Sequence, residues 1–80
     1  MAETLTLYIR RDCHLCEEMH AALQPWQAKL GFTLRSVDID DDITLVAQMG
    51  DKVPVLMHGE QEICHSQLDE LALLACLGSH

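Results

Sequence analysis

Eighty residues, of which 49% are hydrophobic and 22% charged, suffice for one small folded domain and are too few for a second core. The formal net charge is −8, with five Lys and Arg in all, so the chain lacks the basic patches that bind nucleic acids or anionic membranes. No apolar run approaches the ~20 residues of a membrane-spanning helix, and the first residues do not resemble a signal peptide. We expect one soluble domain over residues 1–80 that is cytoplasmic and monomeric.

The first predicted elements are a strand and a helix. Apolar and polar residues alternate over residues 4–9 (TLTLYI), which predicts a strand with two different faces. From His14 the apolar residues recur at helical spacing as far as Leu30, and Gly31 is a typical helix end. Pro25 lacks the N–H that would bond to the preceding turn, so we expect a kink there or two shorter helical pieces.

A second strand and a short helix follow. Residues 32–40 (FTLRSVDID) predict a strand whose alternation slips phase between Leu34 and Val37, as a bulge or burial on both faces would cause. Because a helix separates the two strands, we expect them to be parallel. Residues 41–50 (DDITLVAQMG) predict a short helix between an acidic start and a glycine. We interpret the acidic residues around that start as a solvated helix cap rather than a metal site: Asp38, Asp40, Asp41 and Asp42.

Two more strands and a helix complete the order. Residues 53–65 (VPVLMHGEQEICH) predict two strands around a turn at Gly59. Residues 66–78 (SQLDELALLACLG) predict a helix that begins at Ser66, with Leu71 and Cys76 on its buried face. The resulting order, βαβαββα, predicts an α/β fold of four strands with helices on both faces.

Cys13 and Cys16 are two of four cysteines and stand just before the first predicted helix. In a reducing compartment such thiols are more often catalytic, metal-binding or core residues than a disulfide framework. The unpaired N–H groups and the dipole of a helix start favour a thiolate, so we expect the pKa of Cys13 to be lowered from ~8.5. Thiolates attack disulfides, and Cys16 lies one turn further along and deeper. This predicts a thiol–disulfide oxidoreductase with Cys13 as nucleophile and Cys16 as resolving thiol.

The charges near this pair act in both directions. Positive side chains that favour the thiolate are Arg10, Arg11 and, when protonated, His14. Negative side chains that oppose it are Asp12, Glu17 and Glu18. The helix start is therefore expected to decide the sign of the pKa shift.

Pro54 opens a predicted strand, where proline is poorly tolerated unless the strand is at an edge. A cis Val53–Pro54 bond would turn this loop beside the thiols and leave the Val53 backbone free to pair with an extended substrate. A trans proline in an edge strand is the alternative, since only ~5% of X–Pro bonds are cis.

The chain resembles the glutaredoxin branch of the thioredoxin-like fold over residues 7–23 (LYIRRDCHLCEEMHAAL), 37–40 (VDID) and 52–63 (KVPVLMHGEQEI). Similar proteins are small thiol–disulfide oxidoreductases with a four-stranded mixed sheet. The resemblance implies the roles of nucleophile and resolving thiol for the cysteine pair, and a cis-proline at Pro54. It also implies that Arg10 binds the glycine carboxylate of glutathione.

The chain departs from this family at the glutathione site. The Gly-Gly turn after the last strand is replaced by Cys64 and His65, and the following aspartate by Leu68, with Asp69 one residue out of register. These departures argue against ordinary glutathione dependence. We expect a divergent member without a bound cofactor that acts on protein or low-molecular-weight disulfides. Its reductant would be glutathione or a thioredoxin-type reductase.

Two other interpretations remain open. Cys13 and Cys16, with Cys64, His14 or His65 as further ligands, could bind zinc or an iron–sulfur cluster without redox turnover. The second interpretation is a thioredoxin-like interaction domain that has kept the fold and has no turnover. Of the residues outside the pair, we expect Cys64 to be half-buried in a strand, Cys76 to lie in the core, and three histidines to be at the surface: His20, His58 and His80.

Overall fold

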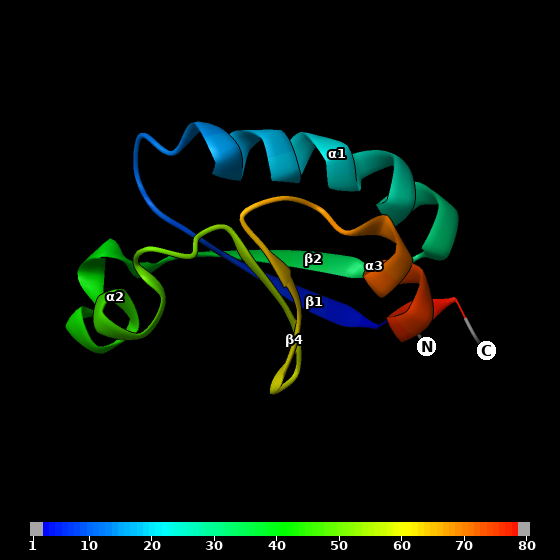
Figure 1. Cartoon of the computed structure of the whole chain (residues 1–80). Helices are drawn as coiled ribbons and strands as arrows, with labels where there is room; N and C mark the ends of the chain where they lie inside the picture. The colour runs from blue at the N-terminus through cyan, green and yellow to red at the C-terminus, as the bar shows by residue number, and fades with distance from the viewer. Residues whose placement is uncertain (1–2, 79–80) are drawn as a thin grey trace.

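The computed structural model describes residues 3–78, so His80 lies outside the described residues. The strands form one sheet in the order β2-β1-β3-β4, and three α-helices accompany it (Figure 1). The strands are β1 (Thr4–Ile9), β2 (Thr33–Asp38), β3 (Val55–His58) and β4 (Gln61–His65). The helices are α1 (His14–Leu30), α2 (Ile43–Met49) and α3 (Glu70–Leu77), and a short 3-10 helix, η1 (Ile39–Asp41), follows β2. The predicted α/β fold, with four strands and three helices in the expected order, is confirmed. The predicted cover of both faces is not met by the described helices, because α1 and α3 pack on the same core and α2 buries no side chain.

The sheet is mixed. β1 pairs with β2 in parallel and with β3 in antiparallel orientation, and β3 and β4 form a hairpin. Of the two explanations for the slipped alternation of β2, the bulge is wrong, because the pairing of β2 with β1 is regular from Thr33 to Asp38. β2 is an edge strand with Leu34 and Val37 half-buried, which explains the broken alternation. The register shift lies instead in the hairpin, between Leu56 and Met57.

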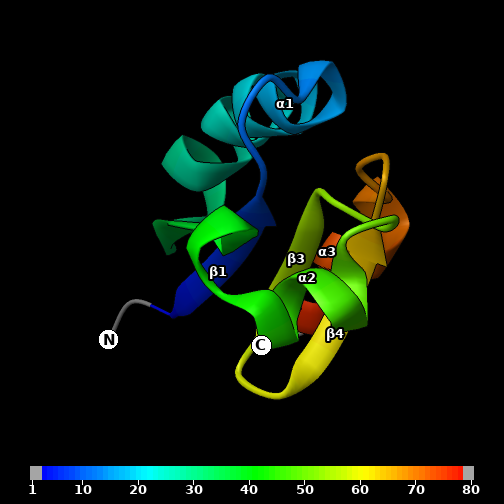
Figure 2. The same cartoon turned by 90° about the vertical axis from the view of Figure 1, so that its left-hand side faces the viewer.

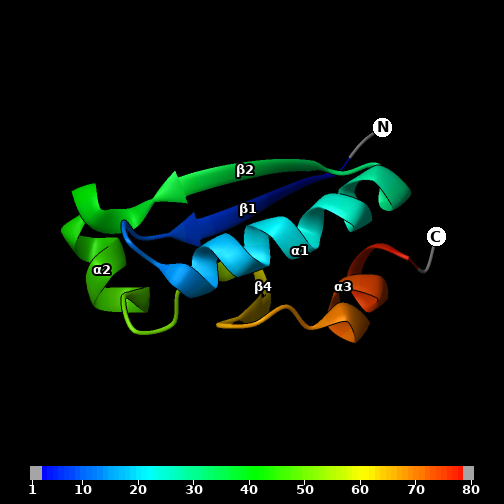
Figure 3. The same ribbon diagram turned by 90° about the horizontal axis from the view of Figure 1, so that it is seen from above.

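A hydrophobic core lies between the sheet and two of the helices. Leu5 and Leu7 point from β1 into this core, and α1 and α3 cover them from one side (Figure 3). The helices contribute the buried residues Met19, Leu23, Leu73 and Leu77. α2 lies beyond the ends of β1 and β2 and buries none of its side chains (Figures 1 and 2). None of the helices in the described residues is long and apolar enough to span a membrane.

Helix α1 has the predicted ends. The helix ends at Gly31, which adopts φ 75° and donates its N–H to the Gln27 carbonyl at 2.9 Å. This left-handed conformation suits glycine, which has no Cβ to clash. The helix runs unbroken past Pro25, so the alternative of two helical pieces is wrong. Trp26 donates its indole N–H to Glu70 at 3.0 Å and thereby links α1 to the start of α3.

Helix α3 begins four residues later than predicted. Ser66 adopts φ 68° and donates its N–H to the Pro54 carbonyl at 2.8 Å, so it does not start a helix. Asp69 caps α3 instead, accepting the Ala72 N–H at 3.0 Å. The predicted buried face is also wrong, since Leu71 is 80% exposed. Every residue of α3 after Glu70 is apolar, so hydrophobic periodicity cannot identify its inward face.

Candidate functional site

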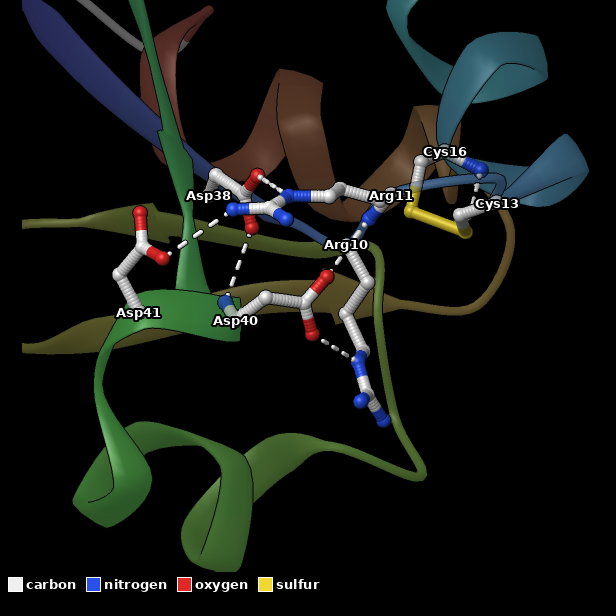
Figure 4. Close-up of polar contacts among 7 residues, drawn as sticks. All are labelled: Arg10, Arg11, Cys13, Cys16, Asp38, Asp40 and Asp41. Atoms are coloured by element: carbon white, nitrogen blue, oxygen red, sulfur yellow. Dashed lines mark hydrogen bonds and ion pairs between the residues drawn. A yellow bond between two sulfur atoms is a disulfide. The ribbon is translucent and has the colours of Figure 1, made fainter.

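The Cys13–Cys16 pair lies at the start of α1, just after the loop that follows β1. Cys13 is the N-cap residue of α1, with extended backbone angles, and Cys16 follows in the first turn. The two form a disulfide with Cα atoms 5.2 Å apart (Figure 4). The Cys13 sulfur also accepts the backbone N–H of Cys16 at 3.1 Å. In the reduced chain this helix-start amide is placed to stabilise negative charge on the Cys13 sulfur.

The two sulfurs differ in their access to solvent. Cys13 is half-exposed, whereas Cys16 is only 4% exposed. A cavity of about 320 Å³ opens beside them, lined by Ile9, Arg10, Asp12, Cys13, Cys16, Glu17 and His20. Of the two sulfurs beside this cavity, that of Cys13 is the more accessible to a molecule entering from solvent. The arrangement therefore suits sequential attack, first by Cys13 and then by Cys16.

The loop before Cys13 is tied to the segment after β2. Arg10 donates from Nε to Asp40 Oδ1 at 2.7 Å, and the Arg11 backbone N–H donates to Asp40 Oδ2 at 2.9 Å. The Arg11 side chain pairs with Asp38 at 3.3 Å and with Asp41 at 3.1 Å (Figure 4). The view of this cluster as a solvated helix cap is therefore incomplete. Two of its members are caps as predicted: Asp42 accepts the Thr44 N–H at the start of α2 at 3.0 Å, and Asp38 accepts the Asp40 N–H at the start of η1 at 2.9 Å.

These contacts change the acidity of the groups that make them. The Arg11 backbone N–H, followed by the Arg10 side chain, lowers the pKa of Asp40. The hydrogen bond to Asp38, followed by the charge of Asp41, raises the pKa of Arg11. Both guanidinium groups are thus compensated by carboxylates. Their capacity to favour a thiolate at Cys13 is reduced, whereas the Cys16 N–H points directly at the Cys13 sulfur.

We expect Asp40→Asn to lower the thermal unfolding midpoint at neutral pH, because the amide loses its charge-assisted bonds to Arg10 and Arg11. Since folding lowers the pKa of Asp40, its contribution is complete above the ordinary aspartate value of ~3.9 and is lost as the pH falls through the lowered pKa. The midpoints of variant and wild type should converge in strong acid. Asp41→Asn, which removes one exposed pair, is the control and should shift the midpoint less. Unchanged midpoints for Asp40→Asn at neutral pH would contradict this role.

The other predicted site residues lie near the pair without lining its cavity. His14 is exposed, and its Nε2 is 3.7 Å from Glu18. Val53 is half-buried, Pro54 is buried, and the bond between them is cis. They precede β3, which is antiparallel to β1, so their loop and the loop after β1 occupy the same end of the sheet. Neither residue is part of the cavity lining.

Cys64 is more deeply buried than predicted. It is 8% exposed and belongs to the hydrophobic core, opposite Leu56 in the hairpin. Burial raises the pKa of its thiol. His65 is exposed and bonds to Glu62 at 3.1 Å. Within residues 3–78 no group of three or more His, Cys, Asp or Glu side chains is arranged to hold a metal ion, so the proposed third ligands do not join the pair.

The environments of Cys76 and His58 differ from those predicted. Cys76 is half-buried at the margin of the core rather than within it, because α3 turns Leu73 and Leu77 inward. Its sulfur lies 3.2 Å from Nδ1 of His58, which is half-buried rather than a free surface residue. His20 is exposed as predicted, although it also lines the cavity beside the cysteine pair.

Comparisons with known proteins agree with the fold. A family model described as "Glutaredoxin-like domain (DUF836)" matches residues 4–78. Protein Ne2328 from Nitrosomonas europaea, solved by NMR, is 39% identical with a TM-score of 0.87, over 96% of this chain and 93% of that one. The X-ray structure of XcR50 from X. campestris is also 39% identical, with a TM-score of 0.74 over 95% of this chain and 97% of the other. A malarial protein, 16% identical with a TM-score of 0.63 over 100% and 98% of the two chains, shares the fold. A search of curated proteins found no match.

Proposed function

We propose that this chain, which belongs to the glutaredoxin-like domain family, catalyses thiol–disulfide exchange with Cys13 as nucleophile and Cys16 as resolving thiol. The observation that carries the proposal is the placement of the pair. A half-exposed N-cap sulfur accepts a helix-start N–H at 3.1 Å beside a cavity, and a buried second sulfur is bonded to it. A stabilised attacking thiolate with a second thiol beside it is the arrangement that dithiol exchange uses.

The proposed reaction proceeds in two exchange steps. The Cys13 thiolate attacks one sulfur of a substrate disulfide, whose S–S bond breaks, and the departing thiolate takes up a proton. Cys16 then loses its proton and attacks the Cys13 sulfur of the mixed disulfide, which releases the second substrate thiol. The substrate gains two electrons, and the chain is left with the Cys13–Cys16 disulfide present in the structure.

The reductant that restores the dithiol is proposed to be a thioredoxin-type reductase rather than glutathione. Arg10, which the family resemblance assigns to a glutathione carboxylate, is bonded to Asp40 at 2.7 Å. Asp69, which stands near the position of the family aspartate, uses its carboxylate to cap α3. Both groups are therefore occupied within the chain. Proposed substrates are protein or low-molecular-weight disulfides in a reducing compartment such as the cytoplasm.

The decisive test uses Cys16→Ser, which removes the resolving thiol. With a small disulfide such as 2-hydroxyethyl disulfide, this variant should accumulate a mixed disulfide on Cys13, seen by intact-mass spectrometry and peptide mapping. Cys13→Ser is the matched control, and its buried Cys16 should remain unmodified. Modification of Cys16 but not Cys13 would reverse the assigned roles, and modification of neither would contradict the proposal.

Turnover of the wild type should then be measured once with glutathione and once with a thioredoxin-type reductase as the electron source, and the two rates compared. Faster turnover with the reductase is expected, and turnover supported by glutathione alone would overturn the choice of reductant. The metal content of the same anaerobically purified sample tests the metal-binding alternative, which stoichiometric zinc or iron would favour.

A further inference from the structure

A second arrangement of a thiol, an imidazole and a carboxylate lies away from the cysteine pair. Cys76 of α3 has its sulfur 3.2 Å from Nδ1 of His58, at the end of β3. The other ring nitrogen of His58, Nε2, is 2.9 Å from the carboxylate of Glu3, just before β1. Because β1 begins where antiparallel β3 ends, this group is at the opposite end of β1 from Cys13. Figures 1 and 3 both show α3 far from the start of α1.

The carboxylate determines which nitrogen of His58 faces the sulfur as an acceptor. An ionised Glu3 only accepts hydrogen bonds, so Nε2 of His58 carries the proton and donates to it. In the neutral ring Nδ1 then carries no proton and can accept the thiol proton of Cys76. A nucleophile, a base within reach and a third group that orients the base together form the arrangement that activates a weak nucleophile.

The thiol needs such a base to react. Burial, followed by the negative charge of Glu3, raises the pKa of Cys76, so the sulfur is protonated at neutral pH. Its reactivity therefore depends on transfer of its proton to His58 as the new bond forms. In this respect Cys76 differs from Cys13, whose sulfur lies at a helix start.

An open cavity gives small molecules access to this thiol. It has a volume of about 460 Å³ and is lined by His58, Gln61, Glu62, Ile63, Ala72, Ala75 and Cys76. The alanines leave room beside the sulfur, and Ile63 supplies an apolar wall. Glu62 on the wall and Glu3 behind His58 are both acidic and disfavour the carboxylates of an anionic ligand.

We propose that Cys76 is a second reactive thiol, activated by His58 and Glu3, that forms a mixed disulfide with uncharged low-molecular-weight disulfides entering this cavity. The Cys76 sulfur attacks one sulfur of the small disulfide, and the S–S bond of that molecule breaks as the new one forms. His58 takes the thiol proton and returns it to the departing thiolate. Cys76 is oxidised to a mixed disulfide, and the departing half of the small molecule is reduced to a thiol.

The test uses a full-length chain in which Cys76 is the only cysteine, made by Cys13→Ser, Cys16→Ser and Cys64→Ala. Its reaction with 2-hydroxyethyl disulfide is followed at neutral pH by intact-mass spectrometry. Adding His58→Phe should slow the reaction at least ~10-fold, because the base is lost. Adding Glu3→Gln should slow it less. His14→Phe, which replaces an exposed histidine at the start of α1 paired with Glu18, is the matched control and should leave the rate unchanged.

A second measurement covers the case in which replacing buried Cys64 impairs folding. The wild-type chain with Cys13 and Cys16 oxidised is exposed to the same disulfide, and peptide mapping follows Cys64 and Cys76 separately. Cys76 is expected to react faster than Cys64, and oxidised glutathione, which is anionic, to react more slowly than the uncharged probe. An unchanged rate in the His58→Phe chain, or Cys76 no faster than Cys64, would overturn the proposal, and faster reaction with oxidised glutathione would overturn its charge preference.

Discussion

Cys13→Ser is expected to lower the turnover of disulfide exchange by at least ~10³-fold, as loss of a nucleophile does in other covalent catalysts. A serine hydroxyl at the N-cap position still accepts the Cys16 N–H, so the helix start is preserved while the nucleophile is lost. The measurement is the steady-state reduction of a small disulfide with a coupled reductase. The variant should keep its far-UV circular dichroism spectrum.

Ser36→Ala serves as the control for this experiment. Ser36 is exposed on the edge strand β2, outside the lining of the cavity beside the cysteine pair. The turnover of the Ser36→Ala variant should equal that of the wild type. A folded Cys13→Ser chain that retained full activity would remove the assignment of Cys13.

Leu73→Ala is expected to destabilise the domain by about 2–5 kcal/mol, the range found when a buried leucine is truncated in a core. Leu73 is 0% exposed and contributes to the core from α3. Folded domains are stable by only ~5–15 kcal/mol, and a chain of this size buries a modest share of its surface. The loss should therefore be a large fraction of the total stability. Urea unfolding monitored by fluorescence of Trp26 measures it.

Leu71→Ala in the same helix provides the matched comparison. Leu71 is 80% exposed, so its truncation should change stability by no more than about 0.5 kcal/mol. The pair also tests the orientation of α3, because the sequence led to the prediction that Leu71 is buried, whereas the structure buries Leu73. A larger loss for Leu71→Ala than for Leu73→Ala would show that the helix is rotated relative to the structure.

Strand β1 and helix α1 were predictable because local rules agree there. Alternation marks Thr4–Ile9, and the helical pattern ends at a glycine that takes the left-handed conformation. The cysteine pair was predictable for the same reason, since its spacing and its place before α1 are local features. Helix α3 was not, because its apolar residues leave no polar face from which to infer orientation.

The contacts of the loop before Cys13 depend on tertiary structure. Arg10 and Asp40 are 30 residues apart, so no local pattern joins them. They follow neighbouring parallel strands, however, whose ends meet at one edge of the sheet, and this topology could have suggested the pairing. The contact of Cys76 with His58 could not be predicted in this way. It requires the rotation of α3, which only side-chain packing determines.

The ion pairs that hold the Arg10–Arg11 loop make its position sensitive to ionic strength. Its ion pairs with the acidic segment reach solvent, and the Arg11 side chain is 65% exposed. Such exposed pairs contribute little to stability and weaken as salt is added, because dissolved ions compete for both charges. The amide that faces the Cys13 sulfur belongs to the same helical turn and is not displaced by dissolved ions. Salt is therefore expected to loosen the approach to α1, while the hydrogen bond from the Cys16 N–H to the Cys13 sulfur persists.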